Sequence, residues 1–341
     1  GILFGNGAEI DVHGLVATTS DISNTDFMNG QYNFNISPEL SNTITNRGTI
    51  TALEGGLVAF VAPGVKNTGI INARLGKVSL AAGNTFTLDL YGDQLVNLGV
   101  DSEVIESVTG IDGEQLKSLI SNNGSIYADG GTVAMDVRTA QSLIDGVINM
   151  SGYIQARSIA KKNGSIYLTG GNEGLVSVSG NIDATGLKTN ETGGIVHVLG
   201  NRVGLYDYAR IDVSGDAGGG LVLVGGDYQG LGLIPTAVDN YVGPNVSIFA
   251  DAVTGGDGGR TIFWADRRTE FFGTIKARGG RLFGDGGFAE VSGKEELYFV
   301  GSVDTTAPNG KSGTLLLDPD YITVSGGSGT ASASGASSFT T

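Results

Sequence analysis

The strongest constraint in this sequence is a glycine-led segment that returns at a nearly constant interval. The segment Gly273-Thr-Ile-Lys-Ala277 returns 28 residues later as Gly301-Ser-Val-Asp-Thr305. Gly259, Gly287 and Gly313 likewise each precede a second short run of β-forming residues, at intervals of 28 and 26 residues. A period this regular indicates structural units that stack on one another.

Each unit consists of short runs of β-forming residues separated by glycine-rich corners. No unit holds an amphipathic helical stripe of about ten residues, which excludes leucine-rich, ankyrin and tetratricopeptide repeats. Without crossover helices, an apolar run such as 221–224 is buried most directly when the chain coils and each strand pairs in parallel with its equivalent one unit later. The sequence therefore predicts an all-β protein, a parallel β-helix (solenoid) with short excursions.

The repeat predicts nine pairs of strands. The first strand of each pair is expected to start near residues 48, 69, 124, 152, 180, 209, 246, 273 and 301, and the second near residues 56, 76, 131, 164, 194, 220, 259, 287 and 313. The wider units later in the chain leave room for a third strand per turn. Ile154, Ile182, Ile275 and Val303 occupy equivalent positions, so we expect them to point inward and stack.

Three segments break the period and are expected to leave the stack. Residues 20–38 are polar and aromatic, and a short hairpin fits there. In 92–122, Asp112 is placed to cap a short helix over residues 114–120. Residues 226–244 read as a loop punctuated by glycine and proline. Loops that leave a solenoid are where binding specificity can lie.

The composition fits one elongated domain followed by a flexible end. The 341 residues include 58 Gly but only 6 Pro, and 40% are hydrophobic, which fits neither collagen nor simple disorder. Residues 325–341 are a low-complexity run of small residues that has nothing to bury, so we expect a flexible tail there.

Charge and cysteine content exclude several classes of function. The chain has 35 acidic and 20 basic residues, a net charge of −15, which argues against a nucleic-acid partner. No apolar run approaches the length of a membrane-spanning helix. The absence of cysteine excludes disulfides and metal–thiolate sites. Because the chain starts at Gly1 without a signal-peptide pattern, we expect it to be a fragment or a processed product.

The residues that typically carry chemistry are sparse. His13 and His197 are far apart and lack the neighbours that base catalysis needs, so ordinary strand or corner positions are expected for both. No cofactor and no metal are predicted. Asp257 and Asp285 lie in glycine-rich turns one unit apart, where a ladder of aspartates could attract a cation. The favoured interpretation is that each accepts a backbone N–H in a tight turn.

Other polar and aromatic residues are expected to be structural. Asp318 and Asp320 flank a proline, where a turn is favoured over a metal pair. Lys161-Lys162 and Arg267-Arg268 are expected at solvated corners. Trp264, the only tryptophan, shares the face of an apolar neighbour, which favours core or half-buried packing over a sugar-stacking platform.

The main enzymatic alternative is a β-helical polysaccharide lyase or hydrolase. Such catalysis needs clustered carboxylates with a nearby acid or base, and fold alone does not decide function. Asp207, Asp212 and Asp216 would approach one another only if the strand between them bends. We therefore expect no enzymatic activity and no catalytic residues.

Several stretches resemble a known family. GILFGNGAEIDVHGLVATTSDIS at the start, and residues 46–83, resemble the secretion domain of the large exoproteins of bacterial two-partner secretion, typified by filamentous haemagglutinin. Later runs such as GGGLVLVGGDYQG and GGFAEVSGK resemble the haemagglutinin-type repeats of that family. The resemblance suggests that residues 1–85 form the C-terminal part of the secretion (haemagglutination activity) domain and residues 86–324 the continuing β-helix repeats.

The resemblance implies a right-handed β-helix. It also implies that the protein crosses the periplasm and is exported through an outer-membrane β-barrel transporter, so that it is secreted or exposed at the cell surface. Gly1 and Ile2 match the end of the family's Asn-Pro-Asn-Gly-Ile motif, so they are implied to be a remnant of the transporter-binding motif. The implied function is an adhesin-type exoprotein, with this segment as its secretion-proximal shaft and a host-cell receptor or glycan as its partner. The alternatives are the shaft of a cytolysin, of a contact-dependent toxin or of a haem-acquisition exoprotein.

Overall fold

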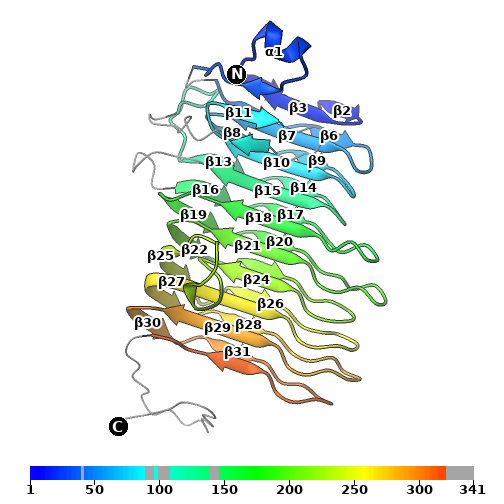
Figure 1. Cartoon of the computed structure of the whole chain (residues 1–341), viewed down its shortest axis with the longest axis vertical. Coiled ribbons are helices and arrows are strands. Elements are labelled where there is room, and N and C mark those ends of the chain that lie inside the picture. The colour runs from blue at the N-terminus through cyan, green and yellow to red at the C-terminus, as the bar shows by residue number, and fades with distance from the viewer. Residues whose placement is uncertain (40–41, 89–95, 99–107, 138–145, 320–341) are drawn as a thin grey trace.

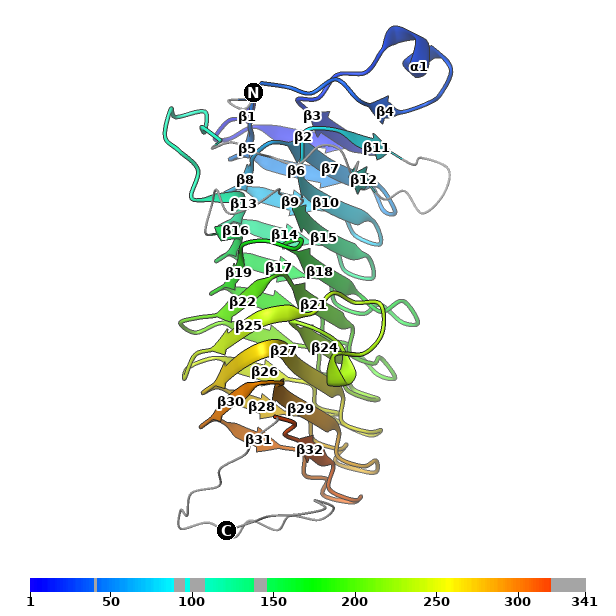
Figure 2. The ribbon, with the colours of Figure 1, turned by 60° about the vertical axis from the view of Figure 1, so that its left-hand side comes forward.

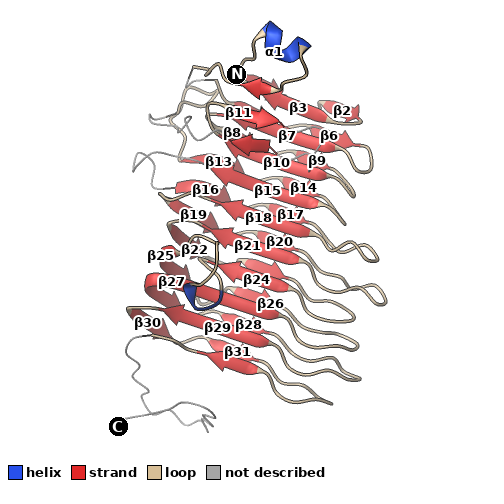
Figure 3. Ribbon diagram, viewed as in Figure 1, coloured by secondary structure: helices blue, strands red, loops and turns tan. Residues whose placement is uncertain are grey.

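The computed structural model describes residues 1–39, 42–88, 96–98, 108–137 and 146–319, which form one long column of stacked strands (Figure 1). The N-terminus lies at one end of the column, and the last described turn lies at the other. Strands of successive turns pair in parallel, as the repeat predicts, and these described residues contain almost no helix (Figure 3). The all-β parallel β-helix is confirmed, and it is right-handed, as connections between parallel strands generally are.

Each turn contributes strands to three faces, which we call the first, second and third face (Figure 2). The first face is a ten-stranded sheet whose strands are mostly three residues long. Its strands are β2 (Glu9–Val12), β6 (Thr49–Ala52), β9 (Ile70–Asn72), β14 (Ser125–Tyr127), β17 (Tyr153–Gln155), β20 (Asn181–Asp183), β23 (Arg210–Asp212), β26 (Ser247–Phe249), β28 (Thr274–Lys276) and β31 (Ser302–Asp304).

The second face follows the first along the chain in every turn. Its strands are β3 (Leu15–Thr18), β7 (Leu57–Ala62), β10 (Lys77–Ala82), β15 (Thr132–Val137), β18 (Ser165–Thr169), β21 (Ile195–Leu199), β24 (Leu221–Val224), β27 (Arg260–Phe271), β29 (Phe288–Gly293) and β32 (Thr314–Leu316). Eighteen start positions were predicted for the first two faces, and all of them precede a strand of the expected face. This agreement confirms the sequence-derived period.

The third face closes each turn and joins the second face through the long strand β27. Its strands are β1 (Ile2–Phe4), β5 (Ile44–Asn46), β8 (Val65–Asn67), β13 (Ser118–Asn122), β16 (Gly146–Met150), β19 (Leu175–Val178), β22 (Arg202–Leu205), β25 (Ala237–Val242), the end of β27 and β30 (Glu296–Phe299). A third strand was expected only in the later turns. It is already present in the first turns, as β5 and β8 show.

Inward-pointing aliphatic side chains stack from turn to turn inside the column. Ile154 pairs in register with Ile182, and both are buried; Ile275 pairs with Val303, and Ile275 is fully buried. Val303 lies on the last turn and is half-buried against the core. Burying one such side chain contributes about 1.5–3 kcal/mol, so the stack is a main source of stability.

One interior column changes its chemistry along the molecule. In the early turns it consists of Asn46, Asn67 and Asn122, whose buried side-chain amides form a ladder, with Nδ2 of each of the first two donating to Oδ1 of the next at 2.8 and 2.7 Å. In the last turns the same column holds Phe271 and Phe299, whose rings stack at 5.5 Å. Both arrangements fill the same corner before the first face.

The segment that was expected to leave the stack at 20–38 does so. It contains the short helix α1 (Asn24–Met28) and β4 (Asn33–Phe34), and an antiparallel bridge between Asp21 and Ile36 closes it like a hairpin. β4 joins β11 (Phe86–Leu88) and β12 (Val96–Leu98) in a three-stranded sheet. Phe34 and Phe86 stack at 4.4 Å and cover the outer side of the second face near β7.

The helix predicted over residues 114–120 is wrong. An antiparallel bridge between Thr109 and Gln115 closes a turn there, and Gly113 adopts the left-handed backbone that such a turn needs (φ +82°). Leu119 and Ile120 lie on β13 and are buried. Their spacing suits a helix, but pairing with β8 and β16 completes the third face, and that tertiary gain prevails over local propensity.

The predicted loop 226–244 is correct only in its first part. Residues 226–236 leave the stack and include the 3-10 helix η1 (Tyr228–Gly230), whereas residues 237–242 are β25, paired with β22 and β27. Ala237, Asn240 and Val242 of β25 are buried, which shows that this half of the segment continues the column.

Candidate functional site

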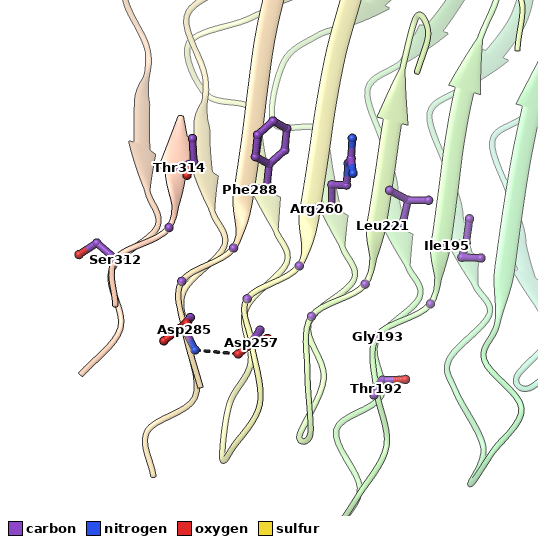
Figure 4. A pocket seen from close by; sticks show the side chains of 18 of the residues that line it. Thr192, Gly193, Ile195, Leu221, Asp257, Arg260, Asp285, Phe288, Ser312 and Thr314 are labelled. Carbon is purple, nitrogen blue, oxygen red and sulfur yellow. Dashed lines mark hydrogen bonds between the residues drawn. The ribbon is translucent and has the colours of Figure 1, made fainter. Parts of the chain in front are cut away.

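A groove with a volume of about 840 Å³ runs along the corners at which the chain enters the second face (Figure 4). Apart from Asn163, its lining comes from five corners, at residues 192–195, 219–221, 257–260, 285–288 and 311–314. One stacking step is roughly 4.8 Å, so the five corners span about 19 Å. The groove is therefore long and narrow, and it presents similar groups at every turn.

Paired glycines form the floor of this groove. A Cβ at Gly220 would lie 2.1 Å from the carbonyl oxygen of Gly194, and a Cβ at Gly287 would lie 2.1 Å from that of Gly259. No side chain fits where successive corners approach this closely. The floor is consequently bare backbone.

Side chains of different character line the two sides of the groove (Figure 4). Ile195, Leu221, Arg260 and Phe288 are first residues of second-face strands and lie in a row on one side. The opposite side carries hydroxyl and carboxylate groups, among them Asp257. A ligand in the groove would meet apolar surface on one side and hydrogen-bonding groups on the other.

Asp257 and Asp285, the aspartates singled out in the sequence, lie on the polar side and act as turn residues. The backbone N–H of Asp285 donates to Oδ1 of Asp257 at 2.7 Å, and that of Lys311 donates to Oδ1 of Asp285 at 2.8 Å. The expectation that they accept backbone N–H groups is confirmed. Across the described ranges, no three His, Cys, Asp or Glu side chains gather closely enough to hold a metal ion.

The segment 226–236, which we call the cover loop, borders the groove. The Tyr228 ring packs edge-on against Phe288 at 5.8 Å, and the Arg260 guanidinium lies about 5 Å from both rings (4.9 and 5.0 Å). Gly230 lies against the Trp264 indole so closely that a Cβ would be 2.5 Å from it. These contacts fix the cover loop onto the outer side of the second face.

Trp264 is buried, with 6% of its surface exposed, but it lies outside the column. It forms an outer cluster with Leu223 and Ile262 beneath the cover loop, and its Nε1–H donates to Oδ1 of Asp266 at 3.1 Å. The packing prediction is confirmed. The indole face is covered, so Trp264 is not a platform for a sugar.

Glu290 is a buried carboxylate beneath the same loop, and sequence reasoning missed it. Its oxygen Oε1 accepts hydrogen bonds from the backbone N–H of Gln229 and the hydroxyl of Ser292, both at 3.1 Å. Burial raises the pKa of Glu290, and these two hydrogen bonds oppose that rise only in part. The signal in the sequence was a charged residue within the otherwise mostly apolar start of β29. In the structure, Glu290 pairs in register with Ile262 of β27.

The histidines occupy ordinary positions, as predicted. His13 is exposed at the corner between β2 and β3, and His197 lies on β21 with its ring edge-on to Tyr167 at 5.1 Å. Burial lowers the pKa of His197, and the charge of Asp227 opposes this. No described side chain lies beside either histidine in the manner of a nucleophile and its base.

The three carboxylates considered for catalysis are not assembled. β23 stays extended and pairs with β20 and β26, so it separates Asp207 from Asp216. Asp212 pairs with Arg210 at 2.6 Å, whereas Asp216 accepts the backbone N–H of Asn190 at 2.8 Å. Asp212 and Asp216 thus each serve a local role.

The basic pairs are at the surface, as expected. Lys161 and Lys162 are exposed. Arg267 forms an ion pair with Asp239 and Arg268 forms one with Glu270, so this pair belongs to a charged surface rather than to a free basic patch. Asp318 is half-buried, and Asp320 lies outside the described residues.

Gly1 and Ile2 lie in the first turn, at the N-terminal end of the column. The backbone N–H of Ile2 donates to the carbonyl of Thr43 at 2.8 Å, and Ile2 packs against the core. The first-turn strands β1, β2 and β3 each pair with one neighbouring strand. Ile2 therefore has a structural role in the first turn, and its role in transporter binding stays a prediction.

The helices of the described residues are short, and none is long and apolar enough to cross a membrane. The predicted tail 325–341 lies outside the described residues.

Comparisons with known proteins identify the family. A family model described as the TPS secretion domain matches residues 1–184, more than half of the chain. The crystal structure of the HMW1 secretion domain from Haemophilus influenzae is similar, with a TM-score of 0.71 and 28% identity, covering 93% of this chain and 77% of that chain. No curated protein sequence matches the chain.

The narrower resemblance to filamentous haemagglutinin and the domain boundary at residue 85 stay predictions. The match to the family model and the shared β-helix agree on the broader assignment. The chain belongs to the TPS secretion domain family, whose members are exported by two-partner secretion, through an outer-membrane transporter, to the cell surface or the extracellular space.

Proposed function

We propose that this segment is the secretion-proximal shaft of an adhesin-type exoprotein that presents surface loops and grooves to a host-cell receptor or glycan. The observation that best supports this proposal is that the column of stacked strands is continuous. First-face strands pair on both sides from β14 through β28, well beyond residue 184. A shaft needs only such stacking, and the surface is left free for attachment.

The separation of Asp207, Asp212 and Asp216 along the described chain supports a non-enzymatic role over a polysaccharide lyase or hydrolase. Glycoside cleavage needs two carboxylates held across one bond. Asp212 and Asp216 instead bond to Arg210 and Asn190. The other effector classes of the family, namely cytolysin, contact-dependent toxin and haem-acquisition protein, would share the same shaft.

Attachment of the purified protein to cultured host cells tests the proposal. The triple variant Asp207→Asn, Asp212→Asn, Asp216→Asn should attach as well as the wild type. Replacing 226–236 with a short Gly-Ser link should weaken attachment, whereas removal of 226–244 would also delete β25 and unfold part of the column.

A reducing-end assay on a panel of polysaccharides accompanies the attachment measurement. We expect no turnover with any variant. Cleavage of a polysaccharide that disappears in the triple variant would move the assignment to a lyase or hydrolase. Wild-type protein that binds no cell surface would contradict the adhesin role.

A further inference from the structure

In each pair of floor glycines, the carbonyl oxygen of the second glycine accepts a strand N–H, whereas that of the first accepts no hydrogen bond within the described residues. The N–H groups of Gly193, Gly219, Gly258 and Gly286 each donate to a backbone carbonyl, at 2.8–3.0 Å. Within the described part of the chain, no hydrogen bond reaches the carbonyl oxygens of these same four glycines. A bound ligand would therefore meet a repeated series of acceptors and would have to supply the donors.

Charged side chains on both sides of the groove add further polar groups, with Asp257 and Asp285 on the polar side and Arg260 in the row on the other side. Asp257 and Asp285 are exposed, and each uses Oδ1 for its backbone hydrogen bond. Arg260 and Lys311 are also exposed, and neither forms an ion pair with any described carboxylate. Carboxylates, a guanidinium and an amine thus stand beside the bare backbone floor.

The side of the groove opposite Asp257 and Asp285 is apolar apart from Arg260. Ile195, Leu221 and Phe288 are half-buried and lie at successive second-face positions with Arg260 between them (Figure 4). A ligand with hydroxyls on its edges and C–H groups on its faces would match both sides at once. An extended peptide would match less well, because strand-like pairing needs donors as well as acceptors from the protein.

We propose that this groove binds an extended neutral oligosaccharide. Sugar hydroxyls donate to the floor carbonyls and to Asp257 and Asp285, and they accept from Arg260 and Lys311. The apolar faces of the sugar rings lie against Ile195 and Leu221. One stacking step of roughly 4.8 Å is comparable to the length of one hexopyranose unit, so successive sugars meet equivalent groups.

Charge selects against acidic glycans and nucleic acid. The chain carries a net charge of −15, and two carboxylates face the ligand directly. A uronate or phosphate chain would be repelled both at long range and at these two side chains. The proposal rests on the attachment function proposed above and names the ligand class for it.

Titration with defined pentasaccharides tests the proposal. Cellopentaose, chitopentaose and mannopentaose are titrated to millimolar concentration and followed by calorimetry and by NMR of the protein. At least one should bind. The double variant Asp257→Asn, Asp285→Asn keeps an oxygen for each backbone N–H but loses both charges, and its affinity should fall about tenfold or more.

Asp304→Asn is the matched control, because Asp304 also accepts a backbone N–H, from Thr306 at 3.1 Å, but lies outside the groove. It should bind like the wild type. Ser312→Trp places bulk at the exposed rim without touching the core, and it should also weaken binding. Binding by the wild type that neither groove variant changes, or no binding of any pentasaccharide, would overturn the proposal.

Cell attachment measured on the same variants separates this proposal from the function on which it rests. Loss of pentasaccharide binding in the groove variants with unchanged attachment supports the groove and places the cell contact elsewhere. Pentasaccharide binding by a protein that attaches to no cell also supports the groove but contradicts the adhesin role.

Discussion

The early and late turns bury polar groups in different places. In the early turns, the amides of Asn46, Asn67 and Asn122 lie inside the column, where each donates to the next. In the late turns the same column is aromatic, and a buried carboxylate, that of Glu290, lies outside the column under the cover loop. An amide both donates and accepts, so it can stack on copies of itself, whereas a carboxylate can only accept and needs other donors.

This difference indicates what each half requires to stay folded. The amide ladder of the early turns is uncharged, and its stability depends on all of its members. Removing one amide leaves a donor and an acceptor unsatisfied on the amides beside it. The aromatic column of the late turns depends on close packing of its rings, because a cavity in a densely packed core is destabilising. We also expect the stability of the late half to depend on pH, because burial raises the pKa of Glu290.

The largest effect is expected in the aromatic half. Phe271 is fully buried and contacts both Phe299 at 5.5 Å and Phe263 at 5.2 Å. Phe271→Ala should lower the free energy of unfolding by about 3–5 kcal/mol, because it removes a ring and leaves a cavity. Urea unfolding followed by circular dichroism measures this loss.

Phe272→Ala is the matched control, because this neighbouring ring is half-buried on the outside, next to Tyr241 and Tyr298. Its loss should be clearly smaller. Equal losses at the two positions would show that the interior column is not what holds the late turns together.

A somewhat smaller effect is expected in the amide ladder. Asn67→Leu leaves Nδ2 of Asn46 and Oδ1 of Asn122 buried without a partner. Each of the two unsatisfied groups costs roughly 1–3 kcal/mol and burial of the leucine side chain offsets part of this cost, so the loss should be about 2–5 kcal/mol, measured by the same urea titration.

The ladder also predicts a recovery that an apolar column would not show. Adding Asn122→Leu to Asn67→Leu removes one of the two unsatisfied groups, so the double variant should be more stable than the single one. A double variant that loses the sum of both single losses would contradict the ladder as a source of stability.

The sequence identified the parts of the fold that glycine corners mark. The eighteen strand starts that were predicted on the first two faces all follow such corners or their equivalents. Third-face strands in the first turns were missed because β5 and β8 are three residues long and end at the corner that was assigned to the next strand. A strand this short carries no periodicity of its own.

The site was harder to predict because it depends on what covers the outer side. The alternation of side chains along a strand correctly placed Trp264 and Ile262 on the same face of β27. When a loop covers the outer face, however, both faces are buried, and the alternation does not tell which of them points into the column. Glu290 was missed for the same reason. Asp257 and Asp285 were found because turn chemistry is local, whereas the groove between corners arises only when turns stack.

The smallest expected effect concerns Glu290 and tests whether the late half alone carries a pH-dependent buried group. The folded-state pKa of Glu290 is raised above its ordinary value by burial. The folded protein therefore holds this proton more tightly than the unfolded chain does. This stabilising contribution is fully present below the unfolded pKa and is lost as the pH rises through the folded pKa.

Glu290→Gln keeps an acceptor for Gln229 and Ser292 but does not titrate. Around pH 7 the variant should be more stable than the wild type, by about 1 kcal/mol, the scale of one hydrogen bond, and the difference should shrink toward pH 4. Urea unfolding of both proteins across this range measures it, and the lowered pKa values of Asp183 and Asp216, which act in the opposite direction, cancel because both proteins share them. A difference that does not change with pH would show that the Glu290 carboxylate is as well solvated under the cover loop as in the unfolded chain.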